Sequence, residues 1–164
     1  LFDTDTIWLL SRVIESFSAR QGLAEVGLPL GNLTSQLLVN VYMNDFDQYV
    51  KRELKVKYYI RYADDFVILS DNKVYLENIL PKISEFLEKN LKLQLHPDKV
   101  FIKTIASGVD FLGWVHFPKH RVLRTSTKRK MLRNLKGNPK EESRQSYLGM
   151  LKHGNTYKLF NKLS

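Results

Sequence analysis

Two adjacent aspartates, Asp64 and Asp65, are the residues of this sequence best suited to metal chemistry. Residues 57–61, rich in Tyr and Ile, precede them and the apolar run 66–69 follows, so we expect a β-hairpin with both acids at or beside its turn. Like charges side by side repel each other, and a divalent cation removes that penalty. Mg²⁺ prefers oxygen ligands, usually one or two carboxylates completed by water and phosphate. The pair predicts a Mg²⁺ site, with a solvated Asp-Asp turn as the alternative.

Any metal bound by this chain must have oxygen or imidazole ligands. The chain has no cysteine, which excludes thiolate metal sites and disulfides. Asp3 and Asp5 precede apolar residues at helical spacing, so we expect them to cap a helix that extends to about Phe17. Because the chain opens with Leu1 and enters this helix almost at once, we interpret it as a piece cut from a longer protein.

The chain carries a large excess of positive charge. Its 164 residues include 26 Lys and Arg against 17 Asp and Glu, a formal net charge of +9. This excess favours a polyanionic partner, although basic residues also serve solubility. A content of 43% hydrophobic residues is ordinary for one folded domain with or without a small appendage, and excludes a disordered chain. No apolar run approaches the roughly 20 residues that span a bilayer, so we expect a soluble cytoplasmic protein without a membrane partner.

Helices and short antiparallel strands are expected around the two aspartates. Apolar residues four apart over residues 34–54 predict a long amphipathic helix, and Asn72 is expected to start another. Strand–turn–strand segments are expected over residues 91–102 and over residues 111–124, the latter with strands at 111–117 and 121–124. Beyond Ser126 the chain is basic and helical. This mixture predicts an α+β fold.

Four segments resemble the motifs of reverse transcriptases, and they occur along the chain in the order that this family requires. Residues 62–65 read Tyr-Ala-Asp-Asp and resemble the family's Tyr-x-Asp-Asp signature. Residues 27–36 resemble its loop and helix under the incoming nucleotide and template, and residues 93–99 its segment ending in a lysine. Residues 111–114, Phe-Leu-Gly-Trp, resemble its hairpin that grips the primer end. The resemblance covers about residues 27–117, and the order of four motifs makes it specific.

The loop motif narrows the resemblance within the family. Most members have Pro-Gln-Gly where this chain has Pro29, Leu30 and Gly31. Pro-Leu-Gly followed by Asn-Leu-Thr-Ser-Gln resembles the loop motif of enzymes from bacterial diversity-generating retroelements. The enzymes of group II introns and retrons are the next most similar. Loss of the glutamine implies less accurate base selection. By resemblance, four residues contact the nucleotide or template: Pro29, Leu30, Gly31 and Gln36.

The resemblance implies nucleotidyl transfer for the intact enzyme. A DNA or RNA primer would be extended on an RNA template with deoxynucleoside triphosphates and two Mg²⁺ ions. One ion lowers the pKa of the primer 3′-hydroxyl and the other neutralises charge on the leaving pyrophosphate. A retroelement accessory protein is a further partner that the resemblance allows.

The fold implied is that of a right-hand polymerase palm, an antiparallel sheet with helices on one face. Residues 1–125 are expected to form this palm in part, and residues 126–164 the beginning of a helical thumb. The fingers and the first palm strand, which carries a third Asp in the family, are expected to be missing. We therefore expect the isolated fragment to be inactive, because two carboxylates without a third cannot fix both metals.

The resemblance also assigns roles to single residues. Asp64 is expected to be the main metal ligand and Asp65 a secondary one. Lys99 would protonate or pair with pyrophosphate, since an ammonium group suits a point contact with phosphate; a surface lysine is the alternative. Three residues are expected to contact the primer: Tyr62, Gly113 and Trp114. For Tyr62, a position in the core is the alternative.

Residues 119–136 are densely basic. The family places thumb helices here against primer and template, so the resemblance implies salt-sensitive phosphate contacts along a duplex. A solvated helix face is the alternative. The expected backbone contacts are Lys128, Arg129, Lys130 and Arg133.

Two other functions are open on the sequence alone. An RNA-templated RNA polymerase more often carries Gly-Asp-Asp at the corresponding turn, and Ala63 argues against it. A basic nucleic-acid-binding module without catalysis would also explain the charge. An apolar strand bearing an Asp upstream of Leu1 would distinguish the polymerase from this module.

Overall fold

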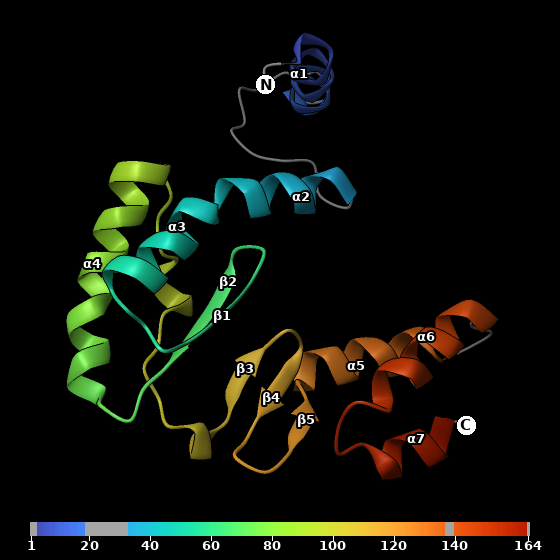
Figure 1. Ribbon diagram of the computed structural model, residues 1–164. Coiled ribbons are helices and arrows are strands. Elements are labelled where there is room, and N and C mark those ends of the chain that lie inside the picture. The colour runs from blue at the N-terminus through green and yellow to red at the C-terminus, as the bar shows by residue number, and fades with distance from the viewer. Residues whose placement is uncertain (1–2, 19–32, 137–139, 164) are drawn as a thin grey trace. The chain divides into compact units, whose positions relative to one another are not determined.

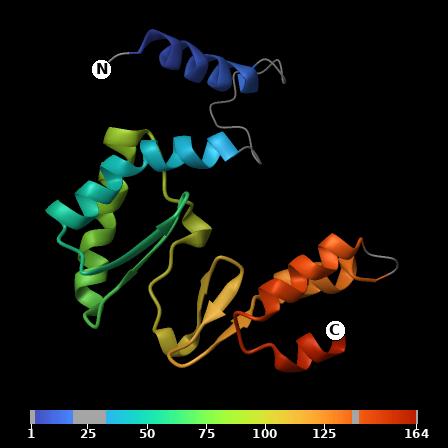
Figure 2. The ribbon, with the colours of Figure 1, turned by 45° about the vertical axis from the view of Figure 1, so that its right-hand side comes forward.

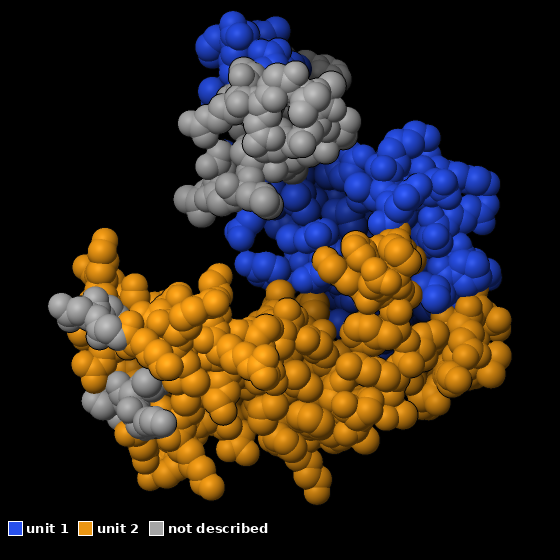
Figure 3. All heavy atoms as spheres, turned by 180° about the vertical axis from the view of Figure 1, so that it is seen from behind, with its two compact units in different colours: residues 1–69, 79–94 blue, residues 70–78, 95–164 orange. Residues whose placement is uncertain are grey.

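A computed structural model describes residues 3–18, 33–136 and 140–163 of the chain (Figure 1). Helices and short antiparallel strands alternate in it, which confirms the α+β prediction. The chain divides into two compact units, coloured separately in Figure 3. Unit 1 comprises residues 1–69 and 79–94, and unit 2 comprises residues 70–78 and 95–164.

The first helix, α1, spans Thr4–Ser18 and begins where the sequence predicts. The carboxylate of Asp3 caps it by accepting hydrogen bonds from the Thr6 hydroxyl at 2.6 Å and the Asp5 backbone N–H at 3.1 Å. The Thr6 hydrogen bond is the main cause of a lowered pKa at Asp3. Asp5 lies in the first turn, where a negative charge suits the helix dipole.

The long helix predicted over residues 34–54 is present as three successive helical segments. These are α2 (Leu33–Tyr42), α3 (Asn44–Gln48) and a π-helical turn, η1 (Tyr49–Glu53). Met43 lies at the joint between α2 and α3, and its N–H still donates to the carbonyl oxygen of Val39 at 2.9 Å. The helical path therefore continues through the joint, and one side of it is buried at Met43, Phe46 and Val50.

A two-stranded hairpin lies against this helical path (Figure 2). Strand β1 spans Tyr58–Tyr62 and strand β2 spans Asp65–Leu69, paired antiparallel. Side chains alternate between the two faces of a strand, and Tyr59 and Arg61 of β1 contact α3. The opposite face of β1 is more than half exposed at Tyr58, Ile60 and Tyr62. Helices thus cover one face of the hairpin, as predicted.

Helix α4 spans Lys73–Leu91 and completes the core of unit 1. Asn72 caps it, its Oδ1 accepting from the Tyr75 backbone N–H at 3.0 Å. The ring of Phe46, fully buried, has its centroid 5.0 Å from that of Phe66 and 6.2 Å from that of Phe86. Phe46 therefore joins α3 to both the hairpin and α4. The buried stripe of α4 has one residue every four positions: Ile79, Ile83, Leu87 and Leu91.

The prediction of two strands over residues 91–102 is wrong. Only a 3-10 turn forms there, η2 (Pro97–Lys99), with the Asp98 N–H donating to His96 Nδ1 at 3.3 Å. His96 and Val100 have extended backbone angles, but within the described part of the chain no strand pairs with this segment. A strand depends on neighbours as much as on its own residues, and this segment has none. A second 3-10 turn, η3 (Ile105–Ser107), follows.

Unit 2 contains a three-stranded antiparallel sheet in the order β3-β4-β5. Its strands are β3 (Val109–Phe111), β4 (Trp114–His116) and β5 (Arg121–Leu123). Leu112 and Gly113 join β3 to β4 with φ angles of 52° and 80°, the pair of positive angles typical of a two-residue hairpin turn. The hairpin predicted around residues 118–120 is confirmed, since β4 and β5 pair antiparallel on either side of it. Its first strand is shorter than the predicted range 111–117, because the β3–β4 turn divides that range, and the hairpin that the resemblance placed at residues 111–114 is present.

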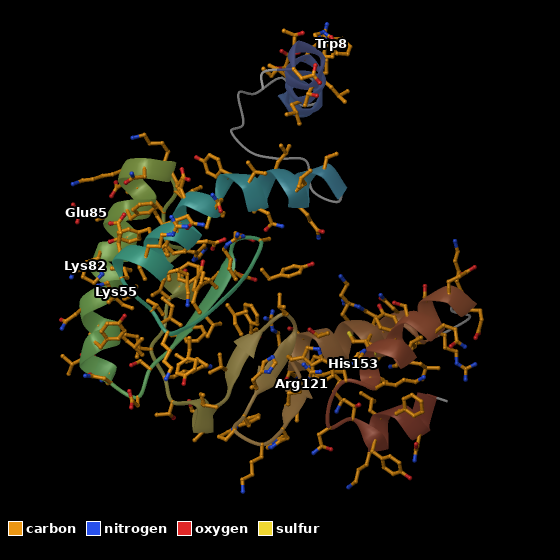
Figure 4. The ribbon with its side chains drawn as sticks, viewed as in Figure 1. Trp8, Lys55, Lys82, Glu85, Arg121 and His153 are labelled. Carbon is orange, nitrogen blue, oxygen red and sulfur yellow. The ribbon has the colours of Figure 1, made fainter. Side chains whose placement is uncertain are left out.

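Three helices follow the sheet and form a core with it. They are α5 (Thr125–Asn134), α6 (Glu141–Leu151) and α7 (Tyr157–Leu163). A Cβ added to Gly154, after α6, would lie 2.0 Å from the Trp114 ring, so this close approach requires glycine. Figure 4 shows Arg121 beside His153, whose carbonyl oxygen accepts a hydrogen bond from Arg121 Nε. The buried core residues of this unit are Trp114, Leu123, Met131 and Leu151.

The strands of the described residues belong to two separate sheets, of two and three strands. The sequence predicted one palm sheet, and the segment between β2 and β3 contributes only α4 and the two 3-10 turns. Among the described helices, none is long and apolar enough to cross a membrane.

Candidate active site

Asp64 and Asp65 lie at the tip of the β1–β2 hairpin, as the sequence predicts. Ala63 and Asp64 form the turn, and Asp65 opens β2 opposite Tyr62. Ala63 has a φ of 52°, the left-handed backbone that primed two-residue turns need at their first central position. For a residue with a Cβ this conformation costs about 1–2 kcal/mol, so contacts from elsewhere are needed to hold the turn.

Both aspartate side chains are exposed and available to a cation. Neither carboxylate makes a hydrogen bond or ion pair with any described residue. Hard oxygen donors without protein partners fit Mg²⁺, which keeps water and phosphate among its ligands. No group of three acidic or histidine side chains able to hold a metal occurs within the described ranges. The pair therefore supplies part of a coordination shell.

Arg61 lies behind this turn and is almost fully buried, with 9% of its side chain exposed. Its Nε and Nη2 donate to the two carboxylate oxygens of Asp47, at 2.8 and 2.5 Å. Its Nη1 donates to the carbonyl oxygen of Ala63 at 2.7 Å and to Asn40 Oδ1 at 3.1 Å. The Tyr59 hydroxyl also donates to Asp47, at 2.6 Å. Groups from α2, α3 and the β1–β2 turn thus converge on one guanidinium group.

The ionisation of this group follows from its hydrogen bonds. The Arg61 guanidinium, followed by the Tyr59 hydroxyl, holds the pKa of Asp47 below its ordinary value against the opposing effect of burial. The Asp47 carboxylate in turn raises the pKa of Arg61. Burial, and then the bond to Asp47, raises the pKa of Tyr59. Asp47 and Arg61 therefore stay charged, and Tyr59 neutral, throughout the neutral pH range.

Gln36 and Tyr62, predicted separately for nucleotide and primer contact, meet at the edge of the hairpin. Gln36 Nε2, on α2, donates to the Tyr62 hydroxyl at 3.3 Å. The Tyr62 side chain is 52% exposed, so it does not take the core position that was the alternative. The other residues predicted at the nucleotide, Pro29, Leu30 and Gly31, lie outside the described residues.

The sequence of this hairpin and its neighbours matches one known family. The family described as reverse transcriptase (RNA-dependent DNA polymerase) matches residues 2–116, more than half of the chain. The chain belongs to the reverse transcriptase family. The match includes the hairpin tip, the partly buried Asp47–Arg61 pair and Lys99, and it confirms the resemblance drawn from the four motifs.

Two curated proteins are similar in sequence to this chain. It is 30% identical over 177 residues to Protein YkfC of Escherichia coli strain K12, covering 87% of this chain and 45% of YkfC. It is 39% identical over 64 residues to the putative COX1/OXI3 intron 2 protein of Saccharomyces cerevisiae strain S288c, covering 38% of this chain and 8% of that protein. The second likeness supports an intron-like type of reverse transcriptase. The chain spans less than half the length of either relative.

Three further residues with predicted roles lie in unit 2: Lys99, Gly113 and Trp114. Lys99 is exposed at the end of η2. Gly113 occupies the β3–β4 turn, where its positive φ suits glycine. Trp114 is only 8% exposed and packs in the core of unit 2. Its indole therefore supports the β3–β4 turn from the side of that core. Direct contact of these residues with primer or pyrophosphate stays a prediction.

The four basic residues predicted to contact nucleic acid lie on α5 but on two sides of it. Arg129, Lys130 and Arg133 line an open hollow together with Thr125 and Ser126. Lys128 lines a different hollow, beside Leu132 and α7. Because α5 lies beyond the residues that the family matches, the prediction of duplex contact rests on charge and position.

Sequence reasoning missed the Asp47–Arg61 pair. The alternation of side chains along β1 could have indicated the burial of Arg61. Arg61 is two residues from Tyr59, so both side chains lie on the face of the strand that turns toward the helices. A charged residue on the buried face of a strand requires a partner. Which acidic residue supplies it depends on how α3 packs, and the local pattern does not contain that information.

Proposed function

We propose that this chain provides the metal-binding hairpin of an RNA-dependent DNA polymerase, which extends a DNA or RNA primer on an RNA template with deoxynucleoside triphosphates. The supporting observation is the position of Asp64 and Asp65 at a hairpin tip within a Tyr-x-Asp-Asp signature, where both are exposed and neither is bonded to another described residue. Membership of the family supports nucleotidyl transfer. The activity of the whole protein is a proposal, since the chain covers 45% of YkfC.

The chain's own residues have distinct parts in the proposed reaction. Asp64 is the principal ligand and Asp65 the secondary ligand of two Mg²⁺ ions, with further oxygen ligands from outside the described residues. When bound there, such ions would activate the primer 3′-hydroxyl and neutralise charge on the pyrophosphate. Tyr62, held by Gln36, supports the primer terminus. Lys99 contributes an ammonium group for pyrophosphate.

We assign residues 1–125 to the palm and residues 126–164 to the beginning of the thumb. Two features favour the palm: α3 and α4 cover one face of the β1–β2 hairpin, and the second hairpin motif forms the β3–β4 turn. The basic residues of α5 favour a thumb helix that contacts duplex phosphates.

Primer extension by the complete protein tests the proposed function. With an RNA template, a labelled primer and Mg²⁺, we expect incorporation of deoxynucleotides in preference to ribonucleotides. Preference for ribonucleotides would favour an RNA-templated RNA polymerase and contradict the proposal. Binding of primer-template without incorporation of either nucleotide would favour a non-catalytic nucleic-acid-binding module.

The salt dependence of primer-template binding tests the α5 surface. Arg129, Lys130 and Arg133 line one hollow, so replacing all three with alanine is expected to shallow the log–log slope of affinity against salt by up to about 3, at roughly 0.9 per phosphate contact. The change is expected to be the same for unrelated nucleic-acid sequences, because phosphate contacts carry no base information. Fluorescence anisotropy at several salt concentrations measures the slope.

The matched control for charge replaces three exposed lysines of α4 with alanine: Lys73, Lys82 and Lys89. This variant removes the same net charge and is expected to change the slope much less. Equal slopes for the two triple variants would identify α5 as an ordinary solvated helix face.

A further inference from the structure

The backbone of the aspartate turn is tied to the buried Arg61 by one hydrogen bond. Arg61 Nη1 donates to the carbonyl oxygen of Ala63 at 2.7 Å. This carbonyl belongs to the peptide unit whose nitrogen is that of Asp64. Because a peptide unit is planar, fixing its oxygen also fixes the direction in which the chain enters Asp64. The contact therefore restrains ψ of Ala63 and φ of Asp64, the angles that aim the Asp64 side chain.

Arg61 can restrain the turn because it is itself held rigidly. The fork of Nε and Nη2 binds both oxygens of Asp47, a bidentate geometry that fixes the guanidinium plane as well as its position. Asn40 accepts a further bond from Nη1 and Tyr59 adds a donor to Asp47. Asp47 lies on α3 directly after Phe46, the fully buried residue of the unit 1 core. The restraint on the turn is thus anchored in that core.

Arg61 is 9% exposed and Asp47 is 29% exposed, so the pair is largely removed from water. Such a pair often contributes little net stability, because desolvation of the two charges offsets their attraction. Simple attachment of β1 to α3 would need only the Asp47 contacts. Attachment alone does not explain the additional bond from Arg61 to the Ala63 carbonyl. A role in positioning the turn explains both this bond and the φ of 52° at Ala63. Backbone strain that the surroundings maintain occurs preferentially at functional sites.

We propose that Arg61 is a positioning residue for the metal ligand Asp64, with the Asp47–Arg61 pair acting as a clamp on the Ala63–Asp64 peptide. This inference rests on the proposed metal-binding role of Asp64. The clamp restrains the backbone from which the Asp64 carboxylate projects toward the metal, so the chain loses less freedom at this turn when the ion binds. Mg²⁺ demands near-ideal octahedral geometry, which makes its affinity sensitive to such orientation.

Direct metal binding and metal dependence test the clamp in the complete protein. Mn²⁺ serves as the probe. The EPR signal gives the concentration of free Mn²⁺ during a titration, from which the dissociation constant of the protein–Mn²⁺ complex follows. Arg61→Lys keeps the charge but loses the bidentate fork, and Asp47→Asn weakens the same pair from α3. Outer partners of metal ligands typically affect affinity by ~10- to 100-fold, and we expect weakening in that range for both variants. The Mg²⁺ concentration for half-maximal primer extension is expected to rise in parallel.

Three controls make the outcome specific. Lys89→Gln breaks the exposed i,i+4 pair of Lys89 with Glu85 on α4 (Figure 4 labels Glu85) and is expected to bind Mn²⁺ as the wild type does. Asp64→Ala defines the site by losing the binding. The double variant Arg61→Lys with Asp47→Asn is expected to bind Mn²⁺ no more weakly than the weaker-binding single variant. Both substitutions remove the same clamp, so their effects should not add.

Several results would overturn the clamp. Unchanged Mn²⁺ binding and Mg²⁺ dependence in both single variants would show that Asp64 does not need it. Lower extension with an unchanged metal requirement, or loss of the hairpin's fold in both variants by thermal unfolding and circular dichroism, would make the pair structural only. Equal Mn²⁺ binding by the wild type and Asp64→Ala would contradict the metal site itself, and the clamp with it.

Discussion

Replacing Asp64 with alanine is expected to abolish primer extension by the complete protein while leaving primer-template binding largely intact. Metal ions contribute several kcal/mol of transition-state stabilisation in such reactions, and each 1.36 kcal/mol is a factor of ten in rate. We therefore expect the rate to fall by about 1000-fold or more. Single-turnover extension measures the rate, and fluorescence anisotropy measures binding of the primer-template.

Asp71 provides the matched control, since it is an exposed aspartate beyond the other end of β2. Asp71→Ala removes the same charge from the same hairpin region and is expected to retain extension within a few-fold of the wild type. The turn of Asp64 is exposed, so Asp64→Ala is expected to leave the fold unchanged. Extension that survives in Asp64→Ala would show that another residue holds the metal.

The hairpin that carries these aspartates was predictable because its signals are local. Two β-rich runs flank a short polar turn, and the alternation of β1 is set within five residues, Tyr58–Tyr62. The caps at Asp3 and Asn72 are local for the same reason. The long helix was predicted for its apolar repeat, but its joint at Met43 and the π-helical turn after Gln48 have no such signal in the sequence.

The errors arose where the outcome depends on distant partners. Residues 91–102 have β-type residues and a Pro-Asp turn, but a strand needs a neighbour, and the described chain supplies none. The strand expected over residues 111–117 divides because Leu112 takes a positive φ beside Gly113, a conformation uncommon for a residue with a Cβ.

The motifs located the site more accurately than they described its side chains. They placed Asp64 correctly at a hairpin tip, but they gave Gln36 and Tyr62 separate roles and did not show that the two side chains meet. They did not show that Trp114 is buried in a core or that Arg61 contacts the turn carbonyl. A motif specifies residue types along the chain, whereas the direction of each side chain follows from packing.

The largest stability effect is expected at Phe46, the residue that joins α3 to the hairpin and α4. Its ring is fully buried and packs against three aromatic rings: Tyr59, Phe66 and Phe86. Phe46→Ala leaves a cavity that these neighbours can fill only in part, so we expect a loss of about 3–5 kcal/mol in the free energy of unfolding. Urea denaturation followed by circular dichroism measures the loss.

Phe101→Ala is the matched control, because Phe101 is 53% exposed and contacts Lys103 through a cation–π interaction. We expect it to lower the free energy of unfolding by about 1 kcal/mol or less. Amide hydrogen exchange locates the effect of Phe46→Ala: protection should fall in β1 and β2 and persist in β4 and β5, which belong to the other compact unit. Since Asp47 follows Phe46 on α3, the same variant should also loosen the hold of Arg61 on the aspartate turn. A small loss of stability with unchanged protection in β1 would show that the hairpin is held without this core, and that the clamp has another anchor.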